Sequence, residues 1–167
     1  LIVGHKNQAT EWMLTYKNIK DAINQYGWDG NRYIYAFADG EKEPYPIGAS
    51  KNKEGNIYLN SQAWSVIAGV ADTERTNKSL ESVRSHLLSD FGPLLFSPSY
   101  TKPDKRIGVQ SEYAPGWRNA NIYPRPAGWA IMAACLANKP DLAWEMYKST
   151  SLPYISDDID RYRAEPY

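Results

Sequence analysis

The residues of this chain that are best suited to chemistry are carboxylates that lie among aromatic residues. Asp29 stands out because it follows Trp28 and precedes Gly30 in the stretch YGWDGNR. An aromatic ring partly desolvates a neighbouring carboxyl group, which favours the protonated form and suits it to donate a proton. Carboxyl groups next to aromatic surfaces are the equipment for breaking a bond between two sugars. Further carboxylates in aromatic-rich loops are Asp39, Glu54, Asp104 and Glu112.

Asp29 also has a purely structural interpretation. An Asp–Gly pair is a strong turn signal, because both residues tolerate backbone conformations that other residues avoid. The two interpretations are compatible, since catalytic groups often occur on tight turns. The sequence therefore predicts a turn at Asp29 and leaves open whether that turn carries an acid.

Other kinds of active site find little support. The two histidines, His5 and His86, and the single Cys135 are too few and too scattered for a metal cluster or a Ser–His–Asp triad. Gly-rich phosphate-binding motifs with the required spacing are absent. These residues therefore predict no metal site.

Composition limits the classes of partner. Lys and Arg number 19 and so do Asp and Glu, which does not favour nucleic acid or an acidic membrane surface. No apolar run approaches the ~18 residues of a membrane span. One cysteine cannot form an internal disulfide, and no secretory leader is evident, so we expect a cytoplasmic protein.

Hydrophobic periodicity predicts a mainly helical chain. A short strand is expected at 31–37, a loop at 41–56 and a long ordered loop at 97–126. Asp72 or Thr73 can cap a helix, and Pro140 fits a first helical turn. The expected helices span 7–26, 61–71, 72 or 73 to about 90, 127–138 and 140–149.

The order of the helices suggests an architecture. The segments 61–71 and 127–138 are apolar on all faces, and each precedes an amphipathic helix. Two concentric helical layers require this alternation, because the inner helix contacts protein on every side. We therefore predict an all-α fold, an α/α barrel or toroid. The expected helices are too few to close such a barrel, so residues 1–167 are predicted to be part of a single catalytic domain.

Several ordered motifs resemble glycoside hydrolase family 94, which includes cellobiose, cellodextrin, cellobionic acid and chitobiose phosphorylases. The family's W-D-G-x-W-Y motif resembles WDGNRY at 28–33. Further similar segments are IGAS at 47–50, EGNIYLNSQAW at 54–64, SPSYTKPDKRIGVQSEYAPG at 97–116 and DRYRAEPY at 160–167.

This resemblance implies an (α/α)6 barrel and an inverting phosphorolysis. Asp29 would protonate the glycosidic oxygen while inorganic phosphate attacks the anomeric carbon from the opposite face and gives an α-sugar 1-phosphate. Because phosphate is already an anion, no second carboxylate is needed to activate water. The resemblance implies a carbohydrate substrate and phosphate as partners, no metal and no organic cofactor. Family members are often homodimers, so a homodimer is an open alternative.

The chain departs from the family pattern at three arginines. Arg125 stands where a His helps to hold phosphate, and a guanidinium can also bind that anion. Arg118 replaces an acid, and Arg32 replaces a Trp that would form a sugar platform. The two cations Arg118 and Arg125 favour a carboxylated acceptor, so cellobionic acid is preferred over cellobiose, with cellodextrins third. Candidate substrate-binding residues are Trp28, Arg32, Gln62, Glu112, Tyr113, Trp117 and Arg118.

Two other functions stay open. A hydrolase with a similar barrel would need a second carboxylate to activate water, and its turnover would not depend on phosphate. A non-catalytic sugar-binding helical module would use the WDG stretch only as a turn. Individual residues also have structural interpretations: Glu112 as a solvated loop carboxylate, Trp64 as a core residue, and Asp104 with Arg106 as a loop ion pair.

Overall fold

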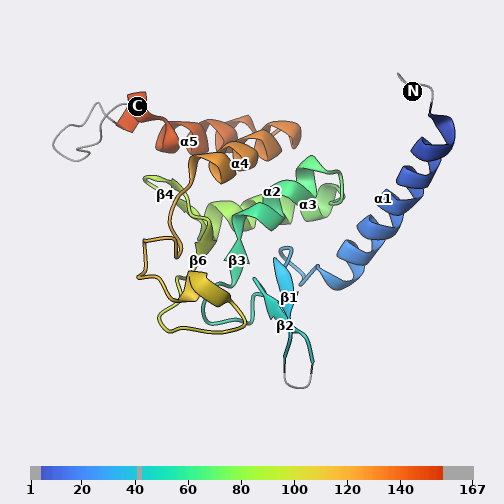
Figure 1. Ribbon diagram of the computed structural model, residues 1–167. Coiled ribbons are helices and arrows are strands. Elements are labelled where there is room, and N and C mark those ends of the chain that lie inside the picture. Colours follow the sequence, from blue (N-terminus) through green and yellow to red (C-terminus); the bar gives the residue numbers. More distant parts are fainter. Residues whose placement is uncertain (1–4, 41–42, 156–167) are drawn as a thin grey trace.

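The computed structural model describes residues 5–40 and 43–155 of the chain. About half of these residues are helical, and the strands are short, which agrees with the predicted helical class (Figure 1). The helices are α1 (Lys6–Tyr26), α2 (Leu59–Ile67), α3 (Thr73–His86), α4 (Pro124–Leu136), α5 (Pro140–Thr150), α6 (Leu152–Ile155) and the 3-10 helix η1 (Gly108–Ser111).

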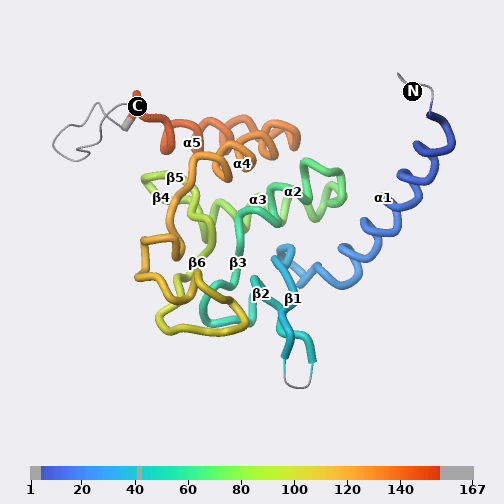
Figure 2. The backbone as a smooth tube through the Cα atoms, viewed as in Figure 1, coloured from blue at the N-terminus to red at the C-terminus, as the bar shows by residue number. Residues whose placement is uncertain are grey.

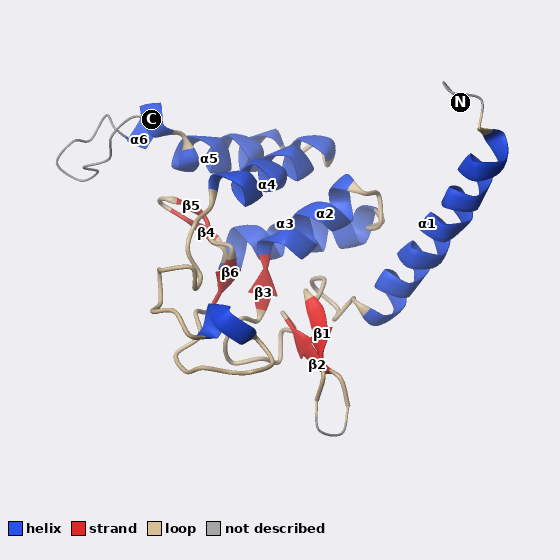
Figure 3. Ribbon diagram, in the orientation of Figure 1, coloured by secondary structure: helices blue, strands red, loops and turns tan. Residues whose placement is uncertain are grey.

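In the described part of the chain, six short strands form three antiparallel pairs. They lie in the connections and at the ends of the helices, where they fix the course of the loops (Figure 3). The pairs are β1 (Ala36–Ala38) with β2 (Tyr45–Ile47), β3 (Ile57–Tyr58) with β6 (Phe96–Ser97), and β4 (Leu88–Ser89) with β5 (Gly92–Pro93).

The main core lies among four helices. Helix α4 packs between α2 and α5, and α3 packs along α2. Small residues of α4, such as Ala130 and Ala133, are buried and allow the helices to approach closely. Larger aliphatic side chains from α3 and α5 fill the remaining space, including Leu80, Val83 and Met146. This core holds the helical frame from which the loops extend.

A second, smaller core lies under the loops. Its buried members are Ile47, Tyr58, Phe96 and Tyr100, which come from β2, β3, β6 and the segment that follows β6. The tube in Figure 2 shows these connections gathered at one end of the helical layer. The aromatic residues that are so frequent in the loops therefore give the loops a core of their own.

The expectation that two helices are buried on all faces is wrong for the described structure. Trp64 of α2 is 45% exposed and Leu136 of α4 is 60% exposed. Helix α1 has no buried residue, and its apolar Trp12 is 64% exposed. Figure 1 shows α1 extending away from the other helices, which it reaches mainly through hydrogen bonds from Tyr16 and Lys20 to carbonyls that follow α2.

The predicted helix starts at Asp72 and Pro140 are confirmed, whereas the predicted end of α3 is not. Asp72 caps α3 by accepting a hydrogen bond from the Arg75 N–H at 2.8 Å, and Pro140 begins α5. Helix α3 stops at His86 rather than near 90, because β4 and β5 form a small hairpin there. The strand expected at 31–37 is shorter and lies further along the chain, at Ala36–Ala38, and the expected loop at 41–56 contains its partner β2.

Candidate active site

Asp29 lies in a tight chain reversal directly after α1. The Ile34 N–H donates to the Gly27 carbonyl at 2.8 Å, and the Asp29 N–H donates to the Arg32 carbonyl at 3.1 Å. Gly30 has a φ of 103°, which L side chains rarely adopt, so glycine is required here. The predicted turn is confirmed, and it places the Asp29 side chain on a rigid backbone.

The two carboxyl oxygens of Asp29 have different surroundings. Oδ2 accepts a hydrogen bond from the Ser50 backbone N–H at 2.6 Å. Oδ1 is buried and has no hydrogen-bond partner among the residues that the structure describes. A buried oxygen without a partner is uncommon in native proteins and invites a functional explanation.

Tyr33 fixes the far side of this reversal. Its backbone N–H donates to Gln62 Oε1 at 2.9 Å, and its carbonyl accepts from Gln62 Nε2 at 2.7 Å. Its hydroxyl donates to Asn24 Oδ1 at 2.7 Å, and burial raises its pKa. Gln62 is completely buried, so the structure places it beneath the reversal, where it supports the backbone.

Trp28 is packed on two sides. Its ring meets the Tyr33 ring edge-on with centroids 4.9 Å apart, and the Arg75 guanidinium lies 5.4 Å from its centroid. Arg75 also hydrogen-bonds to Asn24 Oδ1, which ties α3 to the end of α1. Trp28 is nevertheless half-exposed, so its role in sugar binding stays a prediction.

Arg32 is turned away from solvent and is only 7% exposed. Its guanidinium makes long contacts of 3.4 Å with Asn56 Oδ1 and with His86 Nε2. His86 Nδ1 lies 3.1 Å from the Ser82 carbonyl, to which only an N–H can donate. His86 Nε2 is therefore the acceptor for Arg32, and this cation packs against α3.

A row of aromatic rings connects the Asp29 reversal to a second loop. The Tyr35 and Tyr58 rings stack at 4.4 Å, Tyr58 and Phe96 stack at 4.8 Å, and Phe96 lies 5.4 Å from Tyr100. The Tyr58 and Tyr100 hydroxyls are 2.8 Å apart. Burial raises the pKa of both, that of Tyr100 to about 12, so both phenols stay protonated at neutral pH.

The second loop contains most of the remaining candidates. Arg118 is exposed and has a left-handed backbone with a φ of 56°. Its guanidinium lies 5.5 Å from the Tyr113 ring centroid and 3.4 Å from the Tyr113 hydroxyl. Trp117 is 65% exposed, and Glu112 is exposed as well. The loop thus presents an arginine, two rings and a carboxylate to solvent, a combination suited to a polar sugar.

Arg125 lies in the first turn of α4 and is exposed. Pro124 and Pro126 flank it, and neither has a backbone N–H. The first turn of α4 therefore offers few backbone N–H donors, and an anion would bind there mainly through the Arg125 guanidinium, helped by the positive end of the helix dipole.

The structure brings the candidates together in two groups. Trp28, Asp29, Arg32 and Gln62 surround the first reversal, and Glu112, Tyr113, Trp117 and Arg118 share the second loop. Within the described residues, no hydrogen bond or ion pair joins Asp29 to Arg118 or Arg125. The motif at 160–167 lies outside the residues that the structure describes.

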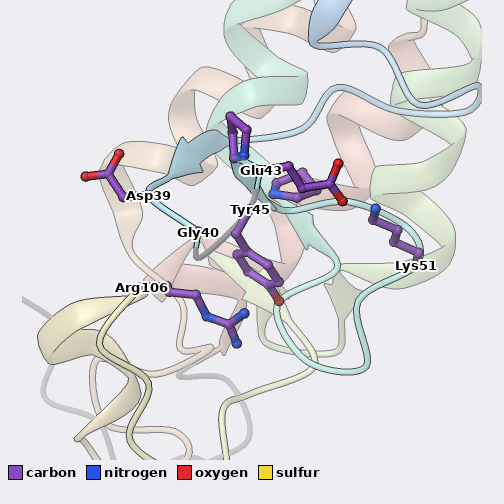
Figure 4. Close-up of a pocket in the computed structure, with 8 residues that line it drawn as sticks. Asp39, Gly40, Glu43, Tyr45, Lys51 and Arg106 are labelled. Atoms are coloured by element: carbon purple, nitrogen blue, oxygen red, sulfur yellow. The ribbon is translucent and has the colours of Figure 1, made fainter.

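A hollow of about 550 Å³ lies elsewhere, beside the β1–β2 hairpin (Figure 4). Arg106 and Tyr45 line it and contact each other, with the guanidinium 3.8 Å from the ring centroid, and Arg106 hydrogen-bonds to Asp104, whose pKa it lowers. Asp39, Glu43 and Lys51 contribute further charges. None of the nine candidate residues lines this hollow, so we do not assign the chemistry to it.

Two further classes of feature are absent from residues 5–40 and 43–155. No helix there combines the length and the apolar character that crossing a membrane requires. Nor does that part of the chain contain a group of three or more His, Cys, Asp or Glu side chains placed to hold a metal ion.

Sequence reasoning missed the residues that position the candidates. The Ser50 contact to Asp29 is made by a backbone N–H, which leaves no trace in side-chain chemistry. Asn119 is fully buried and was not a candidate. The available signal was the motif context, because Ser50 ends the IGAS segment and Asn119 lies in the segment after Gly116.

Comparison with known proteins places the chain in a family. Residues 2–167 match the family model described as Glycosyl hydrolase 94 superfamily, catalytic domain. The chain is 35% identical to solabiose phosphorylase of Paenibacillus borealis over 168 residues, which cover 99% of this chain and 21% of that protein. It is 28% identical to 3-O-beta-D-glucopyranosyl-beta-D-glucuronide phosphorylase of the same organism, over 93% of this chain and 20% of that protein. It is 35% identical to cellobionic acid phosphorylase of Neurospora crassa, over 61% of this chain and 13% of that protein.

Proposed function

Because the chain belongs to the Glycosyl hydrolase 94 superfamily, we propose that the protein that carries it is a glycoside phosphorylase. The chain spans about a fifth of the length of solabiose phosphorylase. Its helices would form part of an (α/α)6 barrel in which the loops of the described structure lie at one rim. The reaction would cleave a β-glucosidic bond with inorganic phosphate, invert the anomeric centre, and release α-glucose 1-phosphate and a shortened acceptor.

The observation that carries this proposal is the arrangement of Asp29. Its carboxyl group lies on a fixed reversal, with one oxygen bound to a backbone N–H and the other buried without a partner. We expect this acid to donate its proton to the glycosidic oxygen as the bond to the anomeric carbon breaks. Because the second oxygen is buried, the bound sugar must displace the groups that cover it. Phosphate attacks from the opposite face, so one acid is sufficient.

Arg125 is the proposed phosphate ligand. A guanidinium can form two parallel hydrogen bonds to phosphate oxygens and keeps its charge at every physiological pH. Its place in the first turn of α4 adds the favourable field of the helix N-terminus. It would thereby compensate for the histidine that the family pattern has at this position.

The proposed acceptor is a carboxylated sugar, with cellobionic acid first, cellobiose second and cellodextrins third. Arg118 supports this choice, because its guanidinium is exposed and lies near the Tyr113 hydroxyl. Two of the relatives carry an acid in their names, a glucuronide phosphorylase and a cellobionic acid phosphorylase. A third relative is named for solabiose instead. The names of the relatives therefore do not agree on one acceptor, and an experiment must identify it.

The deciding experiment uses the full-length natural protein that contains this sequence. Cellobionic acid, cellobiose, cellodextrins, solabiose and the glucosyl glucuronide are each incubated with and without inorganic phosphate. α-Glucose 1-phosphate that forms only with phosphate supports the proposal. Glucose released equally without phosphate indicates the alternative, an inverting hydrolase, and absence of turnover on every sugar favours a non-catalytic sugar-binding module.

The role of Arg118 is tested on the same panel. We expect Arg118→Ala to raise the Michaelis constant for a carboxylated acceptor about tenfold or more, since a charge-assisted bond is lost, and to leave neutral sugars nearly unchanged. Arg84→Ala is the matched control, because Arg84 forms an exposed ion pair with Glu145 on the helical surface. An equal loss on acidic and neutral sugars would remove Arg118 from acceptor selection.

A further inference from the structure

We infer that the backbone N–H of Ser50 is the group that positions Asp29 and assigns its two oxygens to different tasks. This inference deepens the proposed function and rests on it. Ser50 is a positioning residue here, since it acts through Asp29 and has no contact of its own with the reacting atoms.

The hydrogen bond fixes which oxygen holds the proton. The Ser50 N–H can only donate, so Asp29 Oδ2 must accept, at a distance of 2.6 Å that is short for an N–H to oxygen bond. In the protonated carboxyl group the accepting oxygen is the carbonyl oxygen. The acidic proton therefore resides on Oδ1, the buried oxygen that has no partner among the described residues.

The turn that presents this N–H is rigid. The Asn52 N–H donates to the Ala49 carbonyl at 3.0 Å and closes a turn in which Ser50 is the second residue. The Asn52 side chain donates to the Pro46 carbonyl at 2.7 Å, which ties the turn to β2. Ala49 is buried, so the turn cannot shift without disturbing the packing below it.

Gly48 allows the turn to lie this close to the acid. Its φ is 86°, and a Cβ atom at this position would lie 2.8 Å from the Tyr35 backbone nitrogen and 3.2 Å from the Tyr58 ring. Only glycine permits this approach. The turn is thereby seated against the aromatic row, and the Ser50 N–H keeps a fixed direction toward Asp29.

The proton balance of the step is complete. The bond between the anomeric carbon and the glycosidic oxygen breaks, the proton on Oδ1 moves to that oxygen, and a phosphate oxygen bonds to the carbon. Asp29 is left as a carboxylate, which the Ser50 N–H stabilises through Oδ2. The bound phosphate loses one proton in this step, and the carboxylate takes up one proton before the next turnover, so the net proton count is unchanged.

The test removes one N–H and nothing else from the hydrogen-bond pattern. Ser50→Pro lacks the donor, and proline is favoured at the second position of such a turn. Ser50→Ala is the matched control, because it keeps the N–H. Both are made in the full-length protein and assayed for phosphate-dependent turnover on the best disaccharide and on 2,4-dinitrophenyl β-glucoside, whose leaving group needs little protonation.

We expect Ser50→Pro to lower kcat on the disaccharide about tenfold or more, with little change on the aryl glucoside, and Ser50→Ala to match the unaltered protein. A merely structural role would lower both activities equally, and that result would overturn the inference, as would a Ser50→Pro protein with full disaccharide turnover. If Ser50→Pro does not fold, an amide-to-ester substitution at position 50 removes only the N–H. Failure of the unaltered protein to form α-glucose 1-phosphate would instead count against the proposed function itself.

Discussion

Asn119 hydrogen-bonds to both the backbone N–H and the backbone carbonyl of Tyr100, at 2.9 and 2.8 Å. Its amide nitrogen also donates to the Tyr113 carbonyl at 2.8 Å. Gln62 makes the equivalent pair of hydrogen bonds, to the backbone N–H and the backbone carbonyl of Tyr33. Each buried amide satisfies backbone groups in a loop. Tyr33 faces Trp28 in an isolated antiparallel bridge, but its own N–H and carbonyl bond to Gln62. Buried amide side chains therefore help to hold both candidate loops, in which regular secondary structure is sparse.

The three hydrogen bonds of the Asn119 side chain lead to a prediction about stability. Asn119→Asp keeps the shape but loses both donor bonds and places a carboxylate against two carbonyls. We expect the free energy of unfolding to fall by at least about 3 kcal/mol, because buried groups lose their partners and a charge is desolvated. Urea denaturation measures this loss. Asn77→Asp, on the exposed face of α3, is the control and should change stability little.

The Asp29 assignment predicts a loss in rate without a comparable loss in binding. Asp29→Asn keeps the size of the side chain and cannot donate an acidic proton, so kcat should fall by about 10²–10⁴-fold. The Michaelis constants for sugar and phosphate should change far less. Steady-state kinetics with Asp39→Asn as a matched carboxylate control checks this, since Asp39 is exposed at the end of β1. A variant that retained most of its turnover would exclude Asp29 as the acid.

Arg125 predicts a defect that is specific to phosphate. Arg125→Ala should raise the Michaelis constant for phosphate about tenfold or more, because a charge-assisted anion contact is lost. Arg125→Lys should recover part of it, since a lysine keeps the charge but not the two parallel hydrogen bonds. The measurement varies phosphate at saturating sugar, and then sugar at saturating phosphate. A rise confined to the sugar would move Arg125 to the acceptor site.

The paired phenols of Tyr58 and Tyr100 predict how stability depends on alkaline pH. Burial raises both folded-state pKa values, that of Tyr100 to about 12, above the unfolded value of about 10. Their contribution to stability is therefore complete below pH 10 and is lost as the pH rises toward 12. Within that window we expect a decline that approaches about 1.4 kcal/mol per pH unit for each tyrosine.

The urea concentration at the unfolding midpoint, measured between pH 8 and 11, tests this alkaline loss of stability. Tyr100→Phe should flatten the decline, because one of the two coupled phenols no longer ionises. Tyr154→Phe is the control, since Tyr154 is 48% exposed. A decline of the same steepness in the Tyr100→Phe protein would contradict the assignment.

Local chemistry in the sequence determined the helical elements and the turn. The apolar spacing of α1, the Asp72 cap and Pro140 at the start of α5 act within one or two helical turns, so they are readable without tertiary structure. The Asp29–Gly30 reversal is equally local, because it depends on the backbone freedom of glycine. The family motifs added the expectation that this turn carries an acid.

Only the tertiary structure decided what surrounds that acid and what supports the loops. The Ser50 N–H reaches Asp29 across 21 positions, and Asn119 reaches Tyr100 across 19, through contacts that no local pattern encodes. The sequence also did not reveal that α1 is exposed, because periodicity shows that a helix has an apolar face but not what covers that face. The sequence by itself therefore determined which residues are able to act, whereas long-range backbone hydrogen bonds and ring packing decided how they are held, because both arise only when distant segments meet.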